Sequence, residues 1–136
     1  MKFSVSRDQL LKSLNYCQGV IEKRSTLPIL TNVLIEAKNS YIKITATDLD
    51  LIFTNLTNNI KIYTEGSTTT SASVIYDIVR KLSPGSEINF NLVNENKLQL
   101  ESEKSKFNLL CLNPNDFPLL KKILMITNLR LNLKFY

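Results

Sequence analysis

The chain repeats one pattern of polar and apolar residues at an interval of 65 residues. After Ser6, large apolar side chains follow at the fourth, fifth and eighth positions, and the same spacing follows Ser71. This spacing puts them on one face of an α-helix, and serine is favoured at the start of a helix. The repeat therefore predicts two similar amphipathic helices. Their apolar residues are Leu10, Leu11 and Leu14 in the first copy, and Ile75, Tyr76 and Val79 in the second.

Three short segments of strand character follow each expected helix, and residues typical of turns separate them. They are 32–37, 41–46 and 51–56 in the first half, and 87–92, 97–100 and 106–112 in the second. A short extended segment also precedes each serine. We therefore expect an α+β fold, a duplicated βαβββ unit with two helices packed on antiparallel sheets.

The residue types present argue against catalysis. The chain of 136 residues has no histidine, three glycines and two cysteines, Cys17 and Cys111, that lie far apart. It therefore lacks the usual general base, a phosphate-cradling glycine loop and the ligands of a structural zinc site. Asp48 and Asp50 could bind Mg²⁺, but a turn explains them better. We predict a binding module that needs no cofactor or metal.

The net charge of +5 is unevenly distributed. Residues 1–120 hold 13 basic and all 12 acidic residues, which leaves that region at +1, and residues 121–136 hold the other four basic residues. Any affinity for nucleic acid must therefore come from the placement of cations. Lys12 and Arg80 fall on the polar faces of the two expected helices. Those faces are either ordinary solvated surfaces or a joint surface for one anionic partner.

Five segments stand out, in order along residues 1 to about 120. The first combines Met1-Lys2-Phe3 with Arg7, Leu10-Leu11-Lys12 and Leu14. The others are Arg24-Ser25-Thr26-Leu27-Pro28-Ile29-Leu30, Thr47-Asp48-Leu49, Asp77-Ile78-Val79-Arg80 with Leu82 and Pro84-Gly85, and Asp116-Phe117-Pro118. Together they resemble the N-terminal domain of the bacterial DNA polymerase III beta subunit, the DNA sliding clamp.

The resemblance implies a non-catalytic processivity factor whose helices line a ring around double-stranded DNA. Its subunits pair into a dimeric ring, which tethers DNA polymerase III and meets the clamp loader. By matching position, Arg24, Lys12 and Arg80 are expected to contact DNA, with Arg7 and Lys81 as weaker candidates. The opening residues lack the pattern of a secretion signal, and no apolar run reaches the roughly 18 residues of a membrane span, so we expect a cytoplasmic protein without membrane contact.

The resemblance also indicates an edge that joins one subunit to the next. Its expected residues are Lys104, Lys106 and Phe107, with Lys97 on the neighbouring strand. The lysines would meet acidic residues of the other subunit, and Phe107 would fill an apolar pocket. Packing of Phe107 into the core of its own domain is an equal alternative.

The resemblance ends near residue 120. Residues 121–136 do not resemble the linker of the family, so we expect a divergent tail from a truncated or frame-shifted reading. The pocket that binds polymerase and loader peptides lies in later domains of the family and is absent from this chain. The alternative function is therefore that of a truncated fragment, which acts only as an interaction partner of an intact clamp or is a non-functional remnant.

Overall fold

The computed structural model describes residues 1–21 and 28–118. Within these ranges the chain forms nine strands, two α-helices and two short 3-10 helices. The helices are α1 (Arg7–Gln18), α2 (Ala72–Lys81), η1 (Pro28–Thr31) and η2 (Pro114–Asp116). The strands are β1 (Lys2–Ser6), β2 (Asn32–Lys38), β3 (Tyr41–Thr47), β4 (Ile52–Thr57), β5 (Lys61–Thr64), β6 (Gly66–Ser71), β7 (Glu87–Asn94), β8 (Lys97–Ser102) and β9 (Ser105–Leu112).

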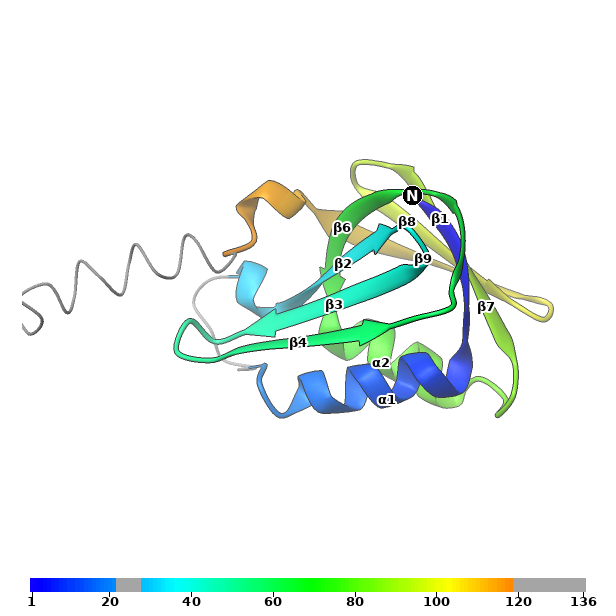
Figure 1. Cartoon of the computed structure of the whole chain (residues 1–136), viewed down its shortest axis with the longest axis horizontal. Helices are drawn as coiled ribbons and strands as arrows, with labels where there is room; N and C mark the ends of the chain where they lie inside the picture. The colour runs from blue at the N-terminus through cyan, green and yellow to red at the C-terminus, as the bar shows by residue number, and fades with distance from the viewer. Residues whose placement is uncertain (22–27, 119–136) are drawn as a thin grey trace, which may run out of the picture.

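All strand pairs are antiparallel, in the order β4-β3-β2-β6-β9-β8-β7-β1-β5 (Figure 1). The strand before each helix lies beside strands of the other half of the chain. β1 pairs with β7 along its whole length, and β6 pairs with β2 from Asn32↔Ser71 to Ala37↔Gly66. The two repeats therefore share their sheets.

The two halves of the sheet meet at a short seam between β6 and β9. Only Thr69↔Leu112 and Thr70↔Cys111 are paired there. Threonine hydroxyls reinforce the seam, because those of Thr69 and Thr70 donate to the carbonyls of Leu112 and Leu110 at 3.0 Å. The hydroxyl of Thr69 also accepts from the side-chain amide of Asn32 at 3.2 Å. These bonds satisfy polar groups that are buried inside the sheet.

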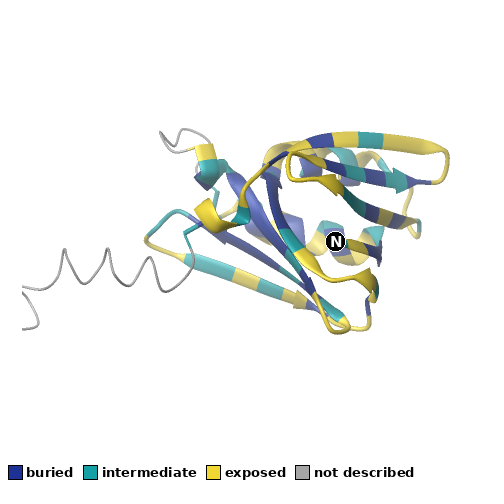
Figure 2. Ribbon diagram, turned by 90° about the horizontal axis from the view of Figure 1, so that it is seen from above, coloured by how far each residue is buried: buried dark blue, intermediate teal, exposed yellow. Residues whose placement is uncertain are grey.

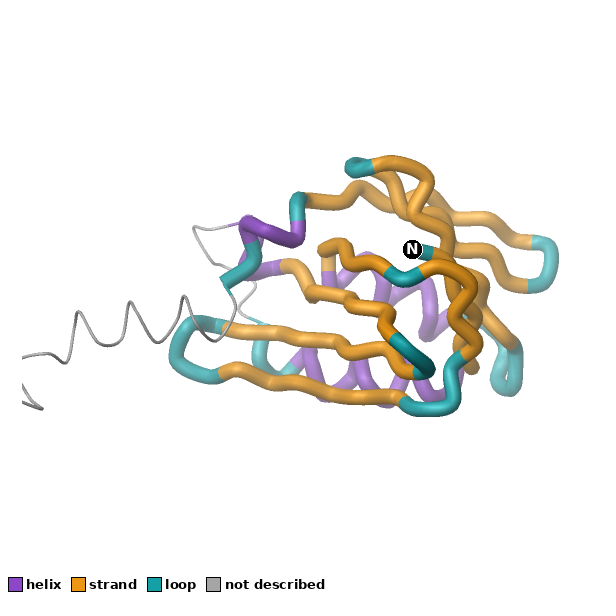
Figure 3. Tube along the Cα trace, turned by 45° about the horizontal axis from the view of Figure 1, so that its top comes forward, coloured by secondary structure: helices purple, strands orange, loops and turns teal. Residues whose placement is uncertain are grey.

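Both helices lie on one side of the sheets (Figure 3). The predicted serine caps are confirmed: the hydroxyl of Ser6 accepts from the amide of Gln9, and that of Ser71 accepts from the amide of Val74. The predicted apolar face is buried at four of its six positions, and Leu11 and Tyr76 are half-buried. The buried positions are Leu10, Leu14, Ile75 and Val79.

One core cluster lies between the helices and the sheets. In Figure 2, buried residues alternate with more exposed ones along several strands, and the hairpin turns are exposed or half-buried. The rings of Phe3 on β1 and Phe90 on β7 stack within this core, with their centroids 4.6 Å apart. The core thus spans both repeats and depends on both.

The structure adds one strand to the predicted pattern and confirms the turn at Asp48. The extra strand, β5, pairs with β1 at the outer edge of the sheet. At the turn, the Asp48 carboxylate accepts from the amides of Asp50 and Leu51 at 3.0 and 2.7 Å, and Leu49 has a φ of 81°. Asp48 therefore serves a backbone turn, for which aspartate is well suited.

Candidate nucleic-acid interface

The two helices lie side by side and run in opposite directions. The side-chain amide of Gln18, at the end of α1, donates to the carbonyl of Ala72, at the start of α2. The Tyr76 hydroxyl donates to the side-chain oxygen of Asn15 at 3.3 Å across the middle of the pair. The start of α1 contacts the end of α2. The outer faces of α1 and α2 therefore form one continuous layer on the side away from the sheets (Figures 1 and 3).

The layer exposes cations from both helices. Lys12 and Lys81 are exposed, and neither belongs to an ion pair among the described residues. The Arg80 side chain is 55% exposed and its guanidinium lies 3.1 Å from a carboxylate oxygen of Asp77. The structure thus places Lys12, Arg80 and Lys81 on the helix layer, as the sequence predicted for its polar faces.

Two residues that the sequence analysis did not assign to a site hold the Arg80 side chain. Its guanidinium lies 5.5 Å from the centre of the Tyr76 ring, which is a cation–π contact, and Asp77 pairs with it from the preceding turn. The spacing of three and four residues within one helix was a usable signal for both contacts. An exposed ion pair contributes only about 0–1 kcal/mol, so Asp77 can release Arg80 to a phosphate.

Arg7 is placed differently from the other candidates. Its side chain is 12% exposed and donates to the carbonyls of Val79 and Arg80. Its guanidinium therefore faces the end of α2 within the domain. Arg24 lies outside the described residues.

The predicted subunit edge is a hairpin of β8 and β9. The first part of β9 pairs only with β8 among the described strands, because its pairing with β6 is confined to Cys111 and Leu112. Lys97, Lys104 and Lys106 are exposed. Phe107 is half-buried and packs against the core. Leu110, which is paired with Lys97 on the same hairpin, is 87% exposed, so an apolar side chain lies on the outer face of the hairpin.

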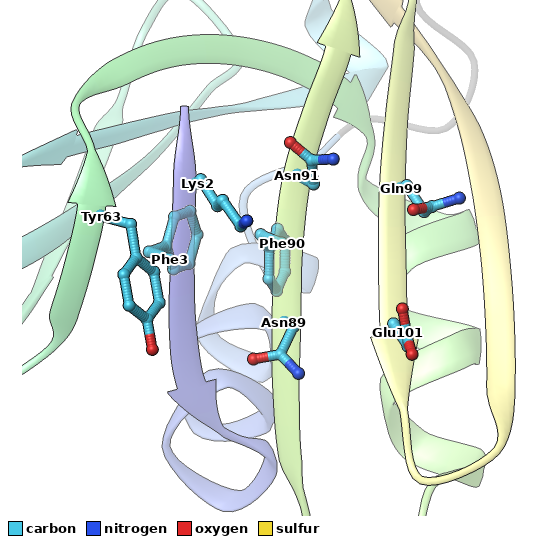
Figure 4. Close-up of a pocket in the computed structure, with 8 residues that line it drawn as sticks. All are labelled: Lys2, Phe3, Tyr63, Asn89, Phe90, Asn91, Gln99 and Glu101. Atoms are coloured by element: carbon cyan, nitrogen blue, oxygen red, sulfur yellow. The ribbon is translucent and has the colours of Figure 1, made fainter.

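A pocket lies on the side of the sheet opposite the helices. It has a volume of about 350 Å³ and is lined by residues of β1, β5, β7 and β8 (Figure 4). Lys2, Asn91 and Glu101 are among its polar lining residues, and Phe3 and Phe90, whose rings are buried in the core, also belong to its lining. Lys2 and Glu101 are its only two ionisable side chains of opposite charge, so the hollow carries no net charge from them. The pocket therefore attracts an anion less strongly than the helix layer, which exposes Lys12, Arg80 and Lys81.

The cysteines and the possible metal ligands among the described residues remain to be placed. Burial raises the pKa of the Cys17 thiol to about 12, and it also raises the pKa of Cys111. Both cysteines are free and buried, and a protonated thiol is a poor nucleophile. Among the described residues, no group of three or more His, Cys, Asp or Glu side chains could hold a metal ion. No helix in the described part of the chain is long and apolar enough to cross a membrane.

Fold and sequence together define the class of protein. The chain belongs to the DNA polymerase III beta subunit family, whose N-terminal domain matches residues 1–121. It is 36% identical over 121 residues to the beta sliding clamp of Caulobacter vibrioides, a match that covers 88% of this chain and 32% of the relative. It is 38% identical over 118 residues to the beta sliding clamp of Escherichia coli K12, with 87% and 32% covered.

Solved structures agree with the assignment. A DnaN sliding clamp from Bartonella birtlesii bound to griselimycin superposes with a TM-score of 0.84 at 42% identity, and the match covers 88% of this chain and 32% of that one. A beta sliding clamp from Caulobacter crescentus superposes with a TM-score of 0.84 at 36% identity, with the same coverage. The chain thus spans about a third of the length of the relatives that it matches.

Proposed function

We propose that this chain provides the first domain of a DNA sliding clamp and contacts duplex DNA through the exposed layer of α1 and α2. The observation that carries this proposal is the presence of Lys12, Arg80 and Lys81 on one continuous helix surface of a chain in this family. The domain acts by holding DNA and catalyses no reaction. We also assign Arg24 to the DNA contact, because its position in the sequence matches that of a DNA-contacting arginine in the family.

The charges of the layer suit sliding better than tight binding. Lys12 and Lys81 are unpaired among the described residues, and the charge of Arg80 is partly balanced by Asp77. Side chains on flexible stems that meet phosphates read no bases, and salt screens their attraction to DNA. Contacts of this kind exchange from one phosphate to the next without a preferred sequence. A processivity factor that tethers DNA polymerase III needs this behaviour.

We assign the contact with a neighbouring clamp subunit to the β8–β9 hairpin. The edge of β9 that pairs with no other described strand can extend a sheet of the neighbour, and Lys97, Lys104 and Lys106 can meet acidic residues there. Exposed Leu110 supplies apolar area, whereas half-buried Phe107 can contribute only its exposed part. DNA polymerase III and the clamp loader are partners of the assembled ring, which we place in the cytoplasm.

Titration of a fluorescent 30-base-pair duplex across a salt series tests the DNA contact. The logarithm of the binding constant should fall linearly with the logarithm of salt concentration, by about 0.9 for each phosphate contacted. Lys12→Ala and Arg80→Ala should each reduce the slope by about 0.9. Lys38→Ala, which removes an exposed lysine at the end of β2, is the matched control and should change nothing. Binding that is absent, or equal in all four proteins, would overturn the proposal.

Sizing chromatography with an intact beta sliding clamp of the family tests the assembly. The chain should elute with the clamp, and Lys106→Glu should abolish this by reversing a charge at the strand edge. Stable co-elution without salt-dependent DNA binding would favour the alternative that the chain is only an interaction partner of a complete clamp. The edge of β9, which lies beside no other strand within residues 1–21 and 28–118 over most of its length, is the observation that favours this second candidate.

A further inference from the structure

Each of the three guanidinium nitrogens of Arg7, the first residue of α1, bonds to an acceptor of its own domain. Its Nε donates to the carbonyl of Val79 at 3.1 Å, and one terminal nitrogen donates to the carbonyl of Arg80 at 2.9 Å. The other terminal nitrogen lies 3.1 Å from a carboxylate oxygen of Asp8. All three nitrogens therefore have acceptors, on a side chain that is 12% exposed.

The backbone around Arg7 makes the same connection. The Arg7 amide donates to the carbonyl of Ser86 at 2.9 Å, and the Asp8 carboxylate accepts from the amide of Gly85 at 3.2 Å. The first two residues of α1 are thus bonded to the last turn of α2 and to the loop that follows it. Among the described residues, the corresponding side-chain contact at the other end of the helix pair is one bond, from Gln18 to Ala72.

The chemistry of these contacts favours arginine specifically. The last carbonyls of a helix have no partner within the helix, and a cation there is favoured by the helix dipole. A planar guanidinium can meet two neighbouring carbonyls at once, whereas a lysine ammonium keeps the charge but lacks the fork. The Val79 carbonyl also accepts from the Leu82 amide at 3.2 Å, so Arg7 completes the cap at the end of α2.

Arg80 is itself one of the residues whose carbonyl Arg7 binds. The backbone from which the Arg80 side chain reaches out is therefore fixed by Arg7. Lys12 lies more than one turn further along α1 and is held by its own helix. We propose that Arg7 is a positioning residue, which holds the last turn of α2 so that Arg80 can meet a phosphate, and that Arg7 does not touch DNA. This inference rests on the proposed DNA contact.

The holding role is measured without DNA, by amide hydrogen exchange followed by NMR. Arg7→Lys keeps the charge and removes the double contact, so exchange at the Leu82 amide should become about tenfold faster, which is the effect of losing one charge-assisted hydrogen bond. Exchange at Leu14, in the middle of α1, should not change. Arg80→Lys is the matched control, because the same substitution at an exposed site should leave Leu82 unaffected. Unchanged exchange at Leu82 in Arg7→Lys would overturn the holding role.

The positioning role is measured by double-mutant cycles on DNA binding across a salt series. At 0.1 M salt, Arg80→Ala should weaken binding by on the order of tenfold through the loss of one phosphate contact. Arg7→Lys should weaken binding in the unaltered chain, add its effect to that of Lys12→Ala, and have no further effect on Arg80→Ala. Full additivity of Arg7→Lys with Arg80→Ala, or unchanged binding by Arg7→Lys alone, would overturn positioning.

The two measurements fail separately. If the unaltered chain shows no salt-dependent binding, the proposed DNA contact is wrong and the positioning of Arg80 for it is wrong with it. The exchange measurement still decides in that case whether Arg7 holds the end of α2.

Discussion

The stacked rings of Phe3 and Phe90 allow a direct measurement of how β1 is held beside β7. The two ring planes are inclined by 13°, and each residue is 1% exposed. Leucine at either position keeps most of the apolar volume but removes the ring contact. We expect Phe3→Leu and Phe90→Leu each to lower the free energy of unfolding by about 1–3 kcal/mol, from imperfect repacking and loss of the stack.

The double variant isolates the stack, because the ring contact can be lost only once. Its loss of stability should be smaller than the sum of the single losses by about 0.5–1.5 kcal/mol. Urea unfolding followed by circular dichroism measures all four proteins of the cycle. Phe117→Leu combined with Phe3→Leu is the control, since Phe117 is equally buried but does not stack on Phe3. A coupling below about 0.3 kcal/mol, the usual error of additivity, would refute a specific contribution of the stack.

Three further predictions concern local structure. Ser6→Ala and Ser71→Ala should each lower the free energy of unfolding by about 1 kcal/mol in urea, because each removes a helix cap; no change would mean that solvent caps the helix equally well. Asp48→Ala should cost about 1–3 kcal/mol by the same assay, and Asp48→Asn much less, because the amide oxygen can still accept; equal losses would contradict the turn role. The raised pKa of Cys17 means that its thiolate forms first in the unfolded chain, so stability should fall as pH rises from about 9 to about 12. Urea unfolding at pH 8 and pH 10 measures this fall, and a Cys17→Ala variant with the same fall would assign it to another group.

The helices could be predicted because their signals are local. A serine cap and three apolar residues at helical spacing describe Ser6 to Leu14 without reference to the rest of the chain. β5 was not predicted, because it is four residues long and only Ile62 among them is even partly buried. Its stability comes from pairing with β1, about 60 residues earlier, and no local pattern reports such a partner.

In the candidate site, too, features set by nearby residues could be predicted, whereas features set by residues distant in sequence could not. The periodicity of α1 and α2 placed Lys12 and Arg80 on exposed faces, and the structure agrees. Arg7 was grouped with them only as a weaker candidate, by its matching position in the family resemblance, and no periodicity supported it. Its carbonyl acceptors lie 72 and 73 residues away, and only the packing of the two helices brings them within reach.

The exchange of first strands between the repeats has a consequence for how the molecule can fold. A single βαβββ unit of this topology leaves a gap beside its second strand, which only the first strand of another unit can fill. The domain therefore has the connectivity of a strand-swapped dimer joined into one polypeptide, and neither half could fold as an autonomous module. Folding requires contacts between residues that are distant in sequence, such as Lys2 and Asn91. Such contacts lower the folding rate. Because β1 pairs with β7 and β6 pairs with β2, each helix follows a strand that is hydrogen-bonded to the other half. The pairing of the strands therefore also sets the spacing of the two helices.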